Sequence, residues 1–271
     1  MSEIATLGLI AGNGIYPLLV ARAARQHGVR EIHVAAFENE TRPDLADAAD
    51  TIEWLRVGQL TRLLKYLTRV GAHHAIMAGQ IAPKNLFELR PDIKALMLLS
   101  KLKQRNAESL FGGVATELAN VGVTLLPAIT FLEESLAGTG WLAGPKAKRR
   151  LLEDAEYGFV VAKEVSRLDI GQTVVIRHGT ILAVEAFEGT NEAIRRGAAL
   201  GRGMAVAVKV SKPNQDFRFD VPVVGCRTIE VAAEAGVKLV AVEAEKTLLL
   251  DRPAVEVAAN QHQVSIYGVS K

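Results

Sequence analysis

A short segment between residues 209 and 222 combines basic and acidic side chains in a way that suits cleavage of a phosphoanhydride. Lys212 and Arg218 can neutralise phosphate oxygens. Asp216 and Asp220 can supply hard oxygen ligands to a divalent cation, or a base for water. Two prolines frame these side chains, so the distances between them are expected to be short and fairly rigid. The segment predicts a site where cation, anion and water meet, with a solvated run of charges as the alternative.

A glycine turn near the N-terminus is a second candidate for binding an anion or a sugar. Gly12, Asn13 and Gly14 follow an apolar run over residues 6–11, which reads as a strand, a turn and the start of a helix. Backbone N–H groups in such a turn can bind phosphate or sugar hydroxyls. Gln80 comes just after another predicted strand, and we expect it to line the same cleft. A purely structural turn is the alternative, because the third glycine of the dinucleotide fingerprint is absent.

An acidic residue after the second predicted strand keeps a dinucleotide-binding hypothesis open. Glu38 stands near the position where a carboxylate would bind the ribose of NAD(P). It lies in a polar, acidic stretch, so an exposed loop is the alternative. An NAD(P)-dependent oxidoreductase is therefore one competing function.

A further candidate contact lies at the start of a predicted helix over residues 190–200. Thr190 or Asn191 is the expected N-cap, which alone would explain both residues. Arg195 and Arg196 follow on the same helix, so its first turns could also bind a phosphate through the helix dipole and a guanidinium. Capping and ligand contact remain open alternatives here.

Apolar runs and helical periodicity predict the elements that must position these side chains. Strands are predicted over 6–11, 31–37, 51–55, 74–78, 123–126, 173–177, 180–186, 205–210, 239–242, 247–250 and 264–267. Helices are predicted from Pro17 onward and over 59–69, 92–103, 109–120, 151–168, 190–200, 226–235 and 253–261. Strands that alternate with helices are typical of α/β proteins.

The chain of 271 residues is long enough for two domains. Residues 1–138 predict a Rossmann-like N-terminal domain, and residues 151–271 predict a second α/β domain that carries the charged segment. Glycines, a proline and a basic cluster between residues 139 and 150 predict the linker.

Composition excludes several classes of protein. The formal net charge of +2, from 32 basic and 30 acidic residues, argues against a nucleic-acid partner. Cys226 is the only cysteine, which excludes an intrachain disulfide and a zinc site built on several thiolates. No signal-peptide pattern opens the chain, and no apolar run approaches the roughly 20 residues that span a bilayer. We expect a cytoplasmic protein whose membrane contact, if any, is peripheral.

The predicted helix over residues 92–103 is the candidate for that membrane contact. Its apolar residues are Ile93, Leu96, Met97, Leu98, Leu99 and Leu102. Its lysines are Lys94, Lys101 and Lys103. The combination indicates a basic amphipathic helix that would suit a membrane-borne substrate, with an ordinary core helix as the alternative.

Five segments, taken together, resemble the LpxI-type UDP-2,3-diacylglucosamine pyrophosphatase family. The segments are residues 10–14, 169–172, 183–190, 212–225 and 241–244. The run K-P-x-Q-D-x-R-x-D-x-P-x-x-G within residues 212–225 is the longest and most specific of them, and the resemblance covers nearly the whole chain.

The resemblance implies a Mg²⁺-dependent hydrolase, with Mn²⁺ as the other candidate cation, in lipid A biosynthesis. Such an enzyme splits UDP-2,3-diacylglucosamine into 2,3-diacylglucosamine 1-phosphate and UMP by attack of water on the α-phosphorus. It also implies two domains joined by a linker, with the ligand cleft between them. A cytoplasmic enzyme peripheral to the inner membrane fits this substrate, and a homodimer is the default expectation.

The resemblance also implies roles for individual residues. Asp220 would be indispensable as metal ligand or base, with Asp216 as the second catalytic and metal-binding acid. Residues expected around the pyrophosphate and the metal are Lys212, Gln215, Asp216 and Arg218. Thr190 and Asn191 would contact the sugar phosphate. Residues expected to receive the nucleotide or the glucosamine are Gly12, Asn13, Gly14 and Gln80.

Two departures from the family pattern favour a competing, non-catalytic function. The family usually has a Gly-Asp-Asp run before the helix that here begins near Asn106, and Gly-Thr-Asp where this chain reads Gly189, Thr190 and Asn191. Loss of these acids makes a nucleotide-sugar binding module the second alternative, and it leaves altered substrate or activity open.

Overall fold

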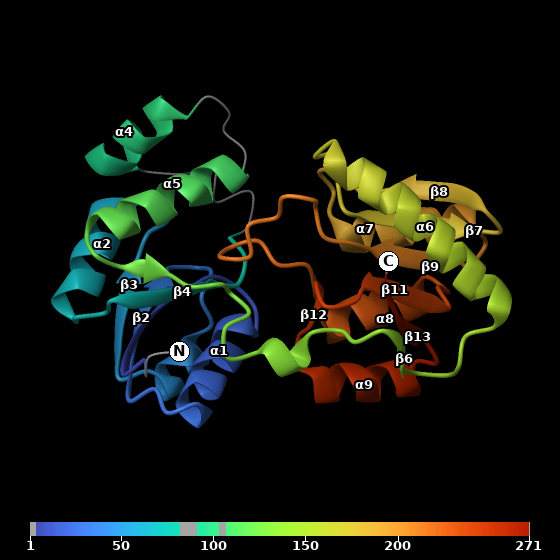
Figure 1. The fold of residues 1–271 in the computed structure, drawn as a ribbon, viewed down its shortest axis with the longest axis horizontal. Coiled ribbons are helices and arrows are strands. Elements are labelled where there is room, and N and C mark those ends of the chain that lie inside the picture. The colour runs from blue at the N-terminus through green and yellow to red at the C-terminus, as the bar shows by residue number, and fades with distance from the viewer. Residues whose placement is uncertain (1–3, 82–90, 103–106, 271) are drawn as a thin grey trace. The chain divides into compact units, whose positions relative to one another are not determined.

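The computed structural model describes residues 4–81, 91–102 and 107–270. The chain forms two compact units (Figure 1). Unit 1 comprises Met1–Glu133 and Asp216–Asp220, and unit 2 comprises Glu134–Gln215 and Val221–Lys271. Both units are α/β, as predicted from the alternation of apolar runs and helices.

The sheet of unit 1 has five parallel strands in the order β3-β2-β1-β4-β5. Its strands are β1 (Thr6–Ala11), β2 (Glu31–Phe37), β3 (Thr51–Leu55), β4 (His74–Ala78) and β5 (Thr124–Leu125). The central strands are short apolar runs buried on both faces, as parallel strands covered by helices require. The strand order reverses between β1 and β4, which confirms the Rossmann-like prediction.

Helices cover both faces of this sheet. They are α1 (Tyr16–Gln26), α2 (Leu60–Arg69), α4 (Ile93–Lys101) and α5 (Ala107–Asn120), and η1 (Pro43–Ala48) is a 3₁₀ helix. One face carries α1, and the other carries α2 and α5, with α4 packed on these two (Figure 1). The Asp92 carboxylate caps α4 by accepting from the Ala95 N–H at 2.9 Å.

Unit 2 contains a mixed sheet of six strands in the order β6-β13-β11-β9-β7-β8. Its strands are β6 (Gly140–Ala143), β7 (Thr173–Arg177), β8 (Thr180–Val184), β9 (Val206–Lys209), β11 (Leu239–Glu243) and β13 (Ser265–Val269). A separate pair is formed by β10 (Val223–Val224) and β12 (Leu248–Leu249). The strands predicted over 173–177 and 180–186 are β7 and β8, which pair antiparallel, and β9, β11 and β13 run parallel.

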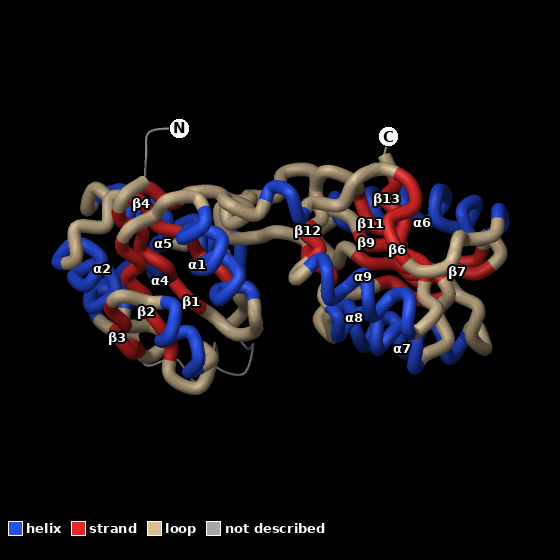
Figure 2. Tube along the Cα trace, turned by 90° about the horizontal axis from the view of Figure 1, so that it is seen from below, coloured by secondary structure: helices blue, strands red, loops and turns tan. Residues whose placement is uncertain are grey.

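Figure 2 shows how helices sandwich the sheet of unit 2, with α6 on one face and α7, α8 and α9 on the other. Their bounds are α6 (Arg149–Arg167), α7 (Thr190–Leu200), α8 (Cys226–Glu234) and α9 (Arg252–Gln261). The 3₁₀ helix η2 (Glu133–Ser135) spans the point in the sequence where unit 1 ends and unit 2 begins. Each face of the sheet has its own apolar core, which consists largely of Ala, Val, Leu and Ile.

The prediction that residues 139–150 form a linker is wrong. Gly140–Ala143 forms β6, which pairs antiparallel with β13 at the edge of the sheet in unit 2. A Cβ on Gly268 would lie 1.8 Å from the Gly138 carbonyl oxygen, so the segment before β6 packs directly on the β13 backbone. Glycines here permit close backbone contact, and they do not mark a flexible connection.

Five residues from the C-terminal half of the sequence belong to unit 1. The N–H of Ala128 donates to the Phe217 carbonyl oxygen at 2.7 Å. The Phe219 ring packs against Phe111 of α5 at a centroid distance of 5.8 Å, and it joins the apolar core of unit 1. Asp216–Asp220 is therefore held within unit 1 by a backbone hydrogen bond and an aromatic contact.

Candidate functional site

The carboxyl ends of β1 and β4 are joined by backbone hydrogen bonds. The Gly12 N–H donates to Ala78 at 2.8 Å, and the Asn13 N–H donates to Gln80 at 2.7 Å. A Cβ on Gly12 would lie 2.6 Å from the Gln80 carbonyl oxygen, so this approach requires glycine. The sequence prediction that the Gly12 turn and Gln80 lie together is confirmed.

Two backbone donors of this turn, those of Gly12 and Asn13, are already used within the fold. The N–H groups of Gly12 and Asn13 are consumed by the bonds to β4, and the Gln80 N–H returns a bond to Asn13 at 3.3 Å. These donors therefore cannot also bind a pyrophosphate. Glu38, the candidate ribose acid, forms an ion pair with Arg56 at 3.3 Å. Both observations remove support from the NAD(P) hypothesis.

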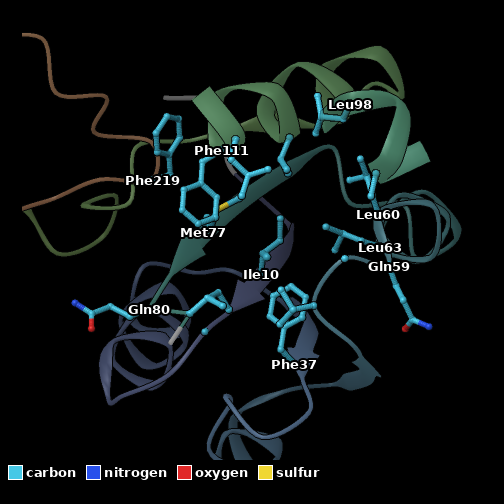
Figure 3. A pocket seen from close by; sticks show the side chains of 18 of the residues that line it. Ile10, Phe37, Gln59, Leu60, Leu63, Met77, Gln80, Leu98, Phe111 and Phe219 are labelled. Carbon is cyan, nitrogen blue, oxygen red and sulfur yellow. The ribbon is translucent and has the colours of Figure 1, made fainter. Parts of the chain in front are cut away.

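An apolar cavity of about 460 Å³ opens beside this turn in unit 1. Its apolar side chains include Ile10, Phe37, Leu60, Leu63, Met77, Leu98, Leu99, Leu110, Phe111, Val114 and Phe219. Figure 3 shows Phe111 and Phe219 at one end of the cavity and Leu60 and Leu63 at the other, with the Gln80 amide directed away from them. Sequence analysis expected apolar contacts from the helix over 92–103 but did not identify this cavity.

Asp220 lies in the wall of the cavity, together with Gly12 and Gln80. Its N–H donates to the Asp216 carbonyl oxygen at 2.9 Å, so a single helical turn sets the position of its side chain. The residue is half-buried. No hydrogen bond or ion pair to its carboxylate is recorded within residues 4–81, 91–102 and 107–270, so Asp220 can accept new partners.

Asp216 already has a partner in the same turn. Its carboxylate accepts from Arg218 Nε at 2.9 Å and from Arg218 Nη2 at 2.6 Å. The hydrogen bonds from Arg218 hold the pKa of Asp216 below its usual value, and the same pairing raises the pKa of Arg218. Asp216 is therefore in an ion pair, whereas the described residues provide none for Asp220.

Two sequence candidates of unit 2, Thr190 and Asn191, lie at the start of α7. The N-cap of this helix is Gly189, so the predicted cap at Thr190 or Asn191 is wrong. The Thr190 hydroxyl instead donates to buried Glu185 at 2.9 Å, and Lys209 Nζ donates to Thr190 Oγ1 at 3.0 Å. Asn191 is half-buried in the first turn.

Buried polar atoms without a partner occur in the same region of unit 2. Glu185 Oε2, Gln172 Oε1 and Gln215 Nε2 have no hydrogen-bond partner among the described residues. Gln215 Oε1 accepts from the Lys212 N–H at 2.7 Å, and Lys212 Nζ forms an ion pair with Asp169. Buried polar atoms of this kind are usually satisfied by water or ligand in native proteins.

A clamp that sequence analysis missed fixes the start of the charged loop. The Glu243 carboxylate accepts from the Ser211 N–H at 2.7 Å, from the Ser211 hydroxyl at 2.8 Å and from Lys163 Nζ at 3.0 Å. Lys163 Nζ also donates to the Ser211 carbonyl oxygen at 2.8 Å. The position of Glu243 at the carboxyl end of β11 was the available signal, since α/β sheets place functional side chains there.

The described part of the chain contains no group of three or more His, Cys, Asp and Glu side chains that could hold a metal ion. A metal bound here would therefore depend on few protein ligands. Asn106 and Lys103, which entered the sequence predictions, lie outside the described residues.

Comparison with known proteins identifies the family to which the chain belongs. A model of the LpxI N-terminal domain matches residues 6–135, and a model of the LpxI C-terminal domain matches residues 138–267. The chain belongs to the LpxI family. The two LpxI domains meet close to the boundary between unit 1 and unit 2.

One LpxI relative has a named activity. The chain is 31% identical over 278 aligned positions to UDP-2,3-diacylglucosamine pyrophosphatase LpxI of Caulobacter vibrioides, and the alignment covers 97% of each protein. A biotin carboxylase domain of Hydrogenobacter thermophilus 2-oxoglutarate carboxylase covers 68% of this chain and 36% of its own, at 16% identity and a TM-score of 0.27. A similarity that low supports no argument about fold or ligand.

Within the described ranges, none of the helices has the length and apolar character needed to cross a membrane.

Proposed function

We propose that this LpxI protein hydrolyses UDP-2,3-diacylglucosamine to 2,3-diacylglucosamine 1-phosphate and UMP. The observation that carries the proposal is the position of Asp220 in the wall of an apolar cavity, with no partner for its carboxylate among the described residues. A substrate that joins acyl chains to a pyrophosphate needs both features within reach of one another. The name of the Caulobacter relative and the match to both LpxI domains favour the same reaction.

The cavity would take at least one acyl chain of the substrate. Its lining is apolar, and each methylene group moved from water into such a lining contributes about 0.8 kcal/mol to binding. Ligand pockets are typically apolar with a few polar groups that orient the ligand, and the residues with polar side chains in this lining are Gln59, Gln80 and Asp220.

The donor set fits one Mg²⁺ or Mn²⁺ ion. Mg²⁺ is usually bound by one or two carboxylates together with substrate phosphates and water, and Asp220 can supply one carboxylate. A bound Mg²⁺ would neutralise charge on the pyrophosphate and polarise the phosphorus under attack. The Asp216 carboxylate is already paired with Arg218, so we assign it a positioning role.

The chemical step transfers the uridine-bearing α-phosphoryl group from the bridging oxygen to water. The water oxygen forms a bond to the α-phosphorus, the bond from that phosphorus to the bridging oxygen breaks, and one proton goes to solvent. Asp220 would orient the water or receive its proton. Arg218, held by Asp216, would contribute positive charge near the phosphates.

The candidates of unit 2 would bind the polar part of the substrate. Gln215 and Glu185 each carry a buried polar atom that lacks a partner among the described residues. Gln215 accepts a hydrogen bond from the Lys212 N–H, and Glu185 accepts one from the Thr190 hydroxyl. Sugar hydroxyls and phosphate oxygens would satisfy such atoms. Asn191 would contact the sugar phosphate beside Thr190. The interdomain cleft stays a prediction.

The cellular setting belongs to the same proposal. A substrate with two acyl chains resides in a membrane, so the protein would act in the cytoplasm with transient contact to the inner membrane surface.

Release of UMP tests the proposal against a non-catalytic sugar-nucleotide module. Wild-type protein with detergent-dispersed UDP-2,3-diacylglucosamine should release UMP only when Mg²⁺ or Mn²⁺ is present. Asp220→Ala should reduce the rate by about 1000-fold, because an acid that acts on the transition state contributes several kcal/mol. Asp47→Ala, at an exposed acid of unit 1, is the matched control and should keep wild-type activity. Circular dichroism checks that both variants are folded.

Two results would contradict the proposal. Binding of the sugar nucleotide without UMP release would identify a binding module. Turnover by Asp220→Ala at the wild-type rate would remove Asp220 from the mechanism.

A further inference from the structure

The large exposed hydrophobic side chains in the described part of unit 1 all lie on α4. They are Ile93, Leu96 and Met97, with exposed fractions of 73%, 53% and 59%. Exposed apolar residues scattered singly are normal, but three within five positions form a patch. Exposed hydrophobic residues of unit 2, by contrast, are distributed over several helices and loops.

The opposite face of α4 lines the apolar cavity. Ala95, Leu98 and Leu99 contribute to its wall, and Leu98 packs so closely on α5 that a Cβ on Gly113 would lie 2.5 Å from it. Figure 3 shows Leu98 directed into the cavity. The nine residues of α4 therefore present apolar side chains on both faces, one toward the cavity and one toward solvent. A helix apolar on both faces is typical of one in contact with two apolar environments.

The charged residues of α4 indicate which kind of partner the exposed apolar patch binds. Lys94 and Lys101 are basic, and no acid occurs between Ile93 and Lys101. Lys94 forms an ion pair with Glu117 at 2.8 Å, whereas Lys101 is exposed in the last turn. Apolar side chains flanked by lysine are the pattern of helices that lie in the headgroup layer of an anionic bilayer.

We propose that Ile93, Leu96 and Met97 of α4 insert into the surface of an anionic membrane, and that acyl chains pass from the bilayer to the cavity behind the same helix. The membrane contact rests on the exposed patch and its charge. The passage of acyl chains rests in addition on the proposed function. One helix thus connects the source of the substrate to the pocket that receives it.

Vesicle binding in the absence of substrate tests the membrane contact. Wild-type protein should co-sediment with vesicles of phosphatidylethanolamine and phosphatidylglycerol, and less with phosphatidylcholine alone. A variant with Ile93→Ser, Leu96→Ser and Met97→Ser should bind the anionic vesicles about tenfold more weakly or less. The matched control removes the same kinds of side chain elsewhere, by Leu200→Ser, Met204→Ser and Val257→Ser in unit 2, and should bind as the wild type.

Several outcomes would overturn the membrane contact. Equal binding by the α4 variant and the wild type is one, and absence of wild-type binding is another. A wild-type dimer that becomes monomeric in the α4 variant, seen by sedimentation velocity, would show that the patch contacts a second copy of the chain.

Turnover measurements separate this inference from the proposed function. The α4 variant should release UMP from detergent-dispersed substrate at the wild-type rate, and from vesicle-borne substrate about tenfold more slowly. Absence of wild-type turnover in detergent would contradict the proposed function and leave the vesicle-binding result standing. Equal turnover by variant and wild type on vesicles would overturn the acyl-chain route.

Discussion

Asp216 and Asp220 are acids of one loop, four residues apart, and their surroundings give them different roles. Arg218 takes up the Asp216 carboxylate in two hydrogen bonds shorter than 3 Å and lowers its pKa. Asp220 has no recorded partner in the described part of the chain and lies against apolar side chains. Spacing in the sequence places both acids together, but only the contact with Arg218 distinguishes the positioning residue from the candidate catalytic one.

The close approach of the backbone at the glycine turn requires glycine at position 79, and this requirement can be tested. Gly79 has a φ of +89°, and a Cβ there would lie 2.6 Å from the Asn13 carbonyl oxygen. We expect Gly79→Ala to lower the free energy of unfolding of unit 1 by about 2–4 kcal/mol, since the left-handed backbone and the overlap both add cost. Urea denaturation, followed by Trp54 fluorescence in a Trp141→Phe background, measures unit 1 alone.

Gly14→Ala is the matched control for this substitution. Gly14 has the same φ of +89°, but among the described residues no atom beyond its own chain neighbours lies within 4 Å of the added Cβ. Its cost should be limited to backbone strain, about 1–2 kcal/mol. Equal losses at Gly79 and Gly14 would mean that close packing between the β1 and β4 loops does not contribute.

At the scale of elements, Glu243 anchors the charged loop to the sheet of unit 2. Glu243→Gln would leave Lys163 without its charge partner. It would also replace one accepting oxygen of the carboxylate by a donating amide group, although the donors around it come from Ser211 and Lys163. We expect a loss of about 1–3 kcal/mol in the unfolding free energy of unit 2, because the pair is only partly exposed. Trp141 fluorescence in a Trp54→Phe background reports this transition.

Glu153→Gln, on the same helix as Lys163, is the control for Glu243→Gln. It forms an ion pair with Arg149, and the exposed fractions of the two side chains are 56% for Glu153 and 93% for Arg149. Loss of such a pair should change stability by less than about 0.5 kcal/mol. A small effect of both substitutions would show that the clamp does not stabilise unit 2.

The elements themselves were largely predictable from periodicity. Helices α6, α7 and α9 and the strands of unit 1 lie within a few residues of their predicted bounds, because their apolar spacing reports burial directly. Residues 139–150 were misassigned, since glycines that allow close backbone packing look the same in sequence as glycines of a linker. The sequence predicted that N–H groups of the Gly12 turn could bind an anion, because a single sequence does not show that the end of β4 accepts from Gly12 and Asn13.

At the scale of the whole molecule, the chain returns to unit 1 for five residues after building most of unit 2. This return places Phe219 and Asp220 in the wall of a cavity otherwise formed by the first half of the chain. No local pattern in the sequence reports such a long-range contact, since Phe219 meets Phe111 across more than a hundred residues. The acid and the apolar lining consequently form one site although they are encoded far apart.

That arrangement predicts that acyl-chain length and catalysis can be separated by mutation. Val114 of α5 lines the cavity, so Val114→Phe should exclude part of an acyl chain while leaving Asp220 in place. Each excluded methylene group removes about 0.8 kcal/mol of binding, so exclusion of two should lower kcat/KM for UDP-2,3-diacylglucosamine by about tenfold or more. A soluble analogue with acetyl groups in place of the long chains should be turned over by the variant as by the wild type. Ala119→Phe, exposed on the same helix, should affect neither substrate, whereas an equal loss on both substrates in Val114→Phe would show that the cavity does not hold the acyl chain.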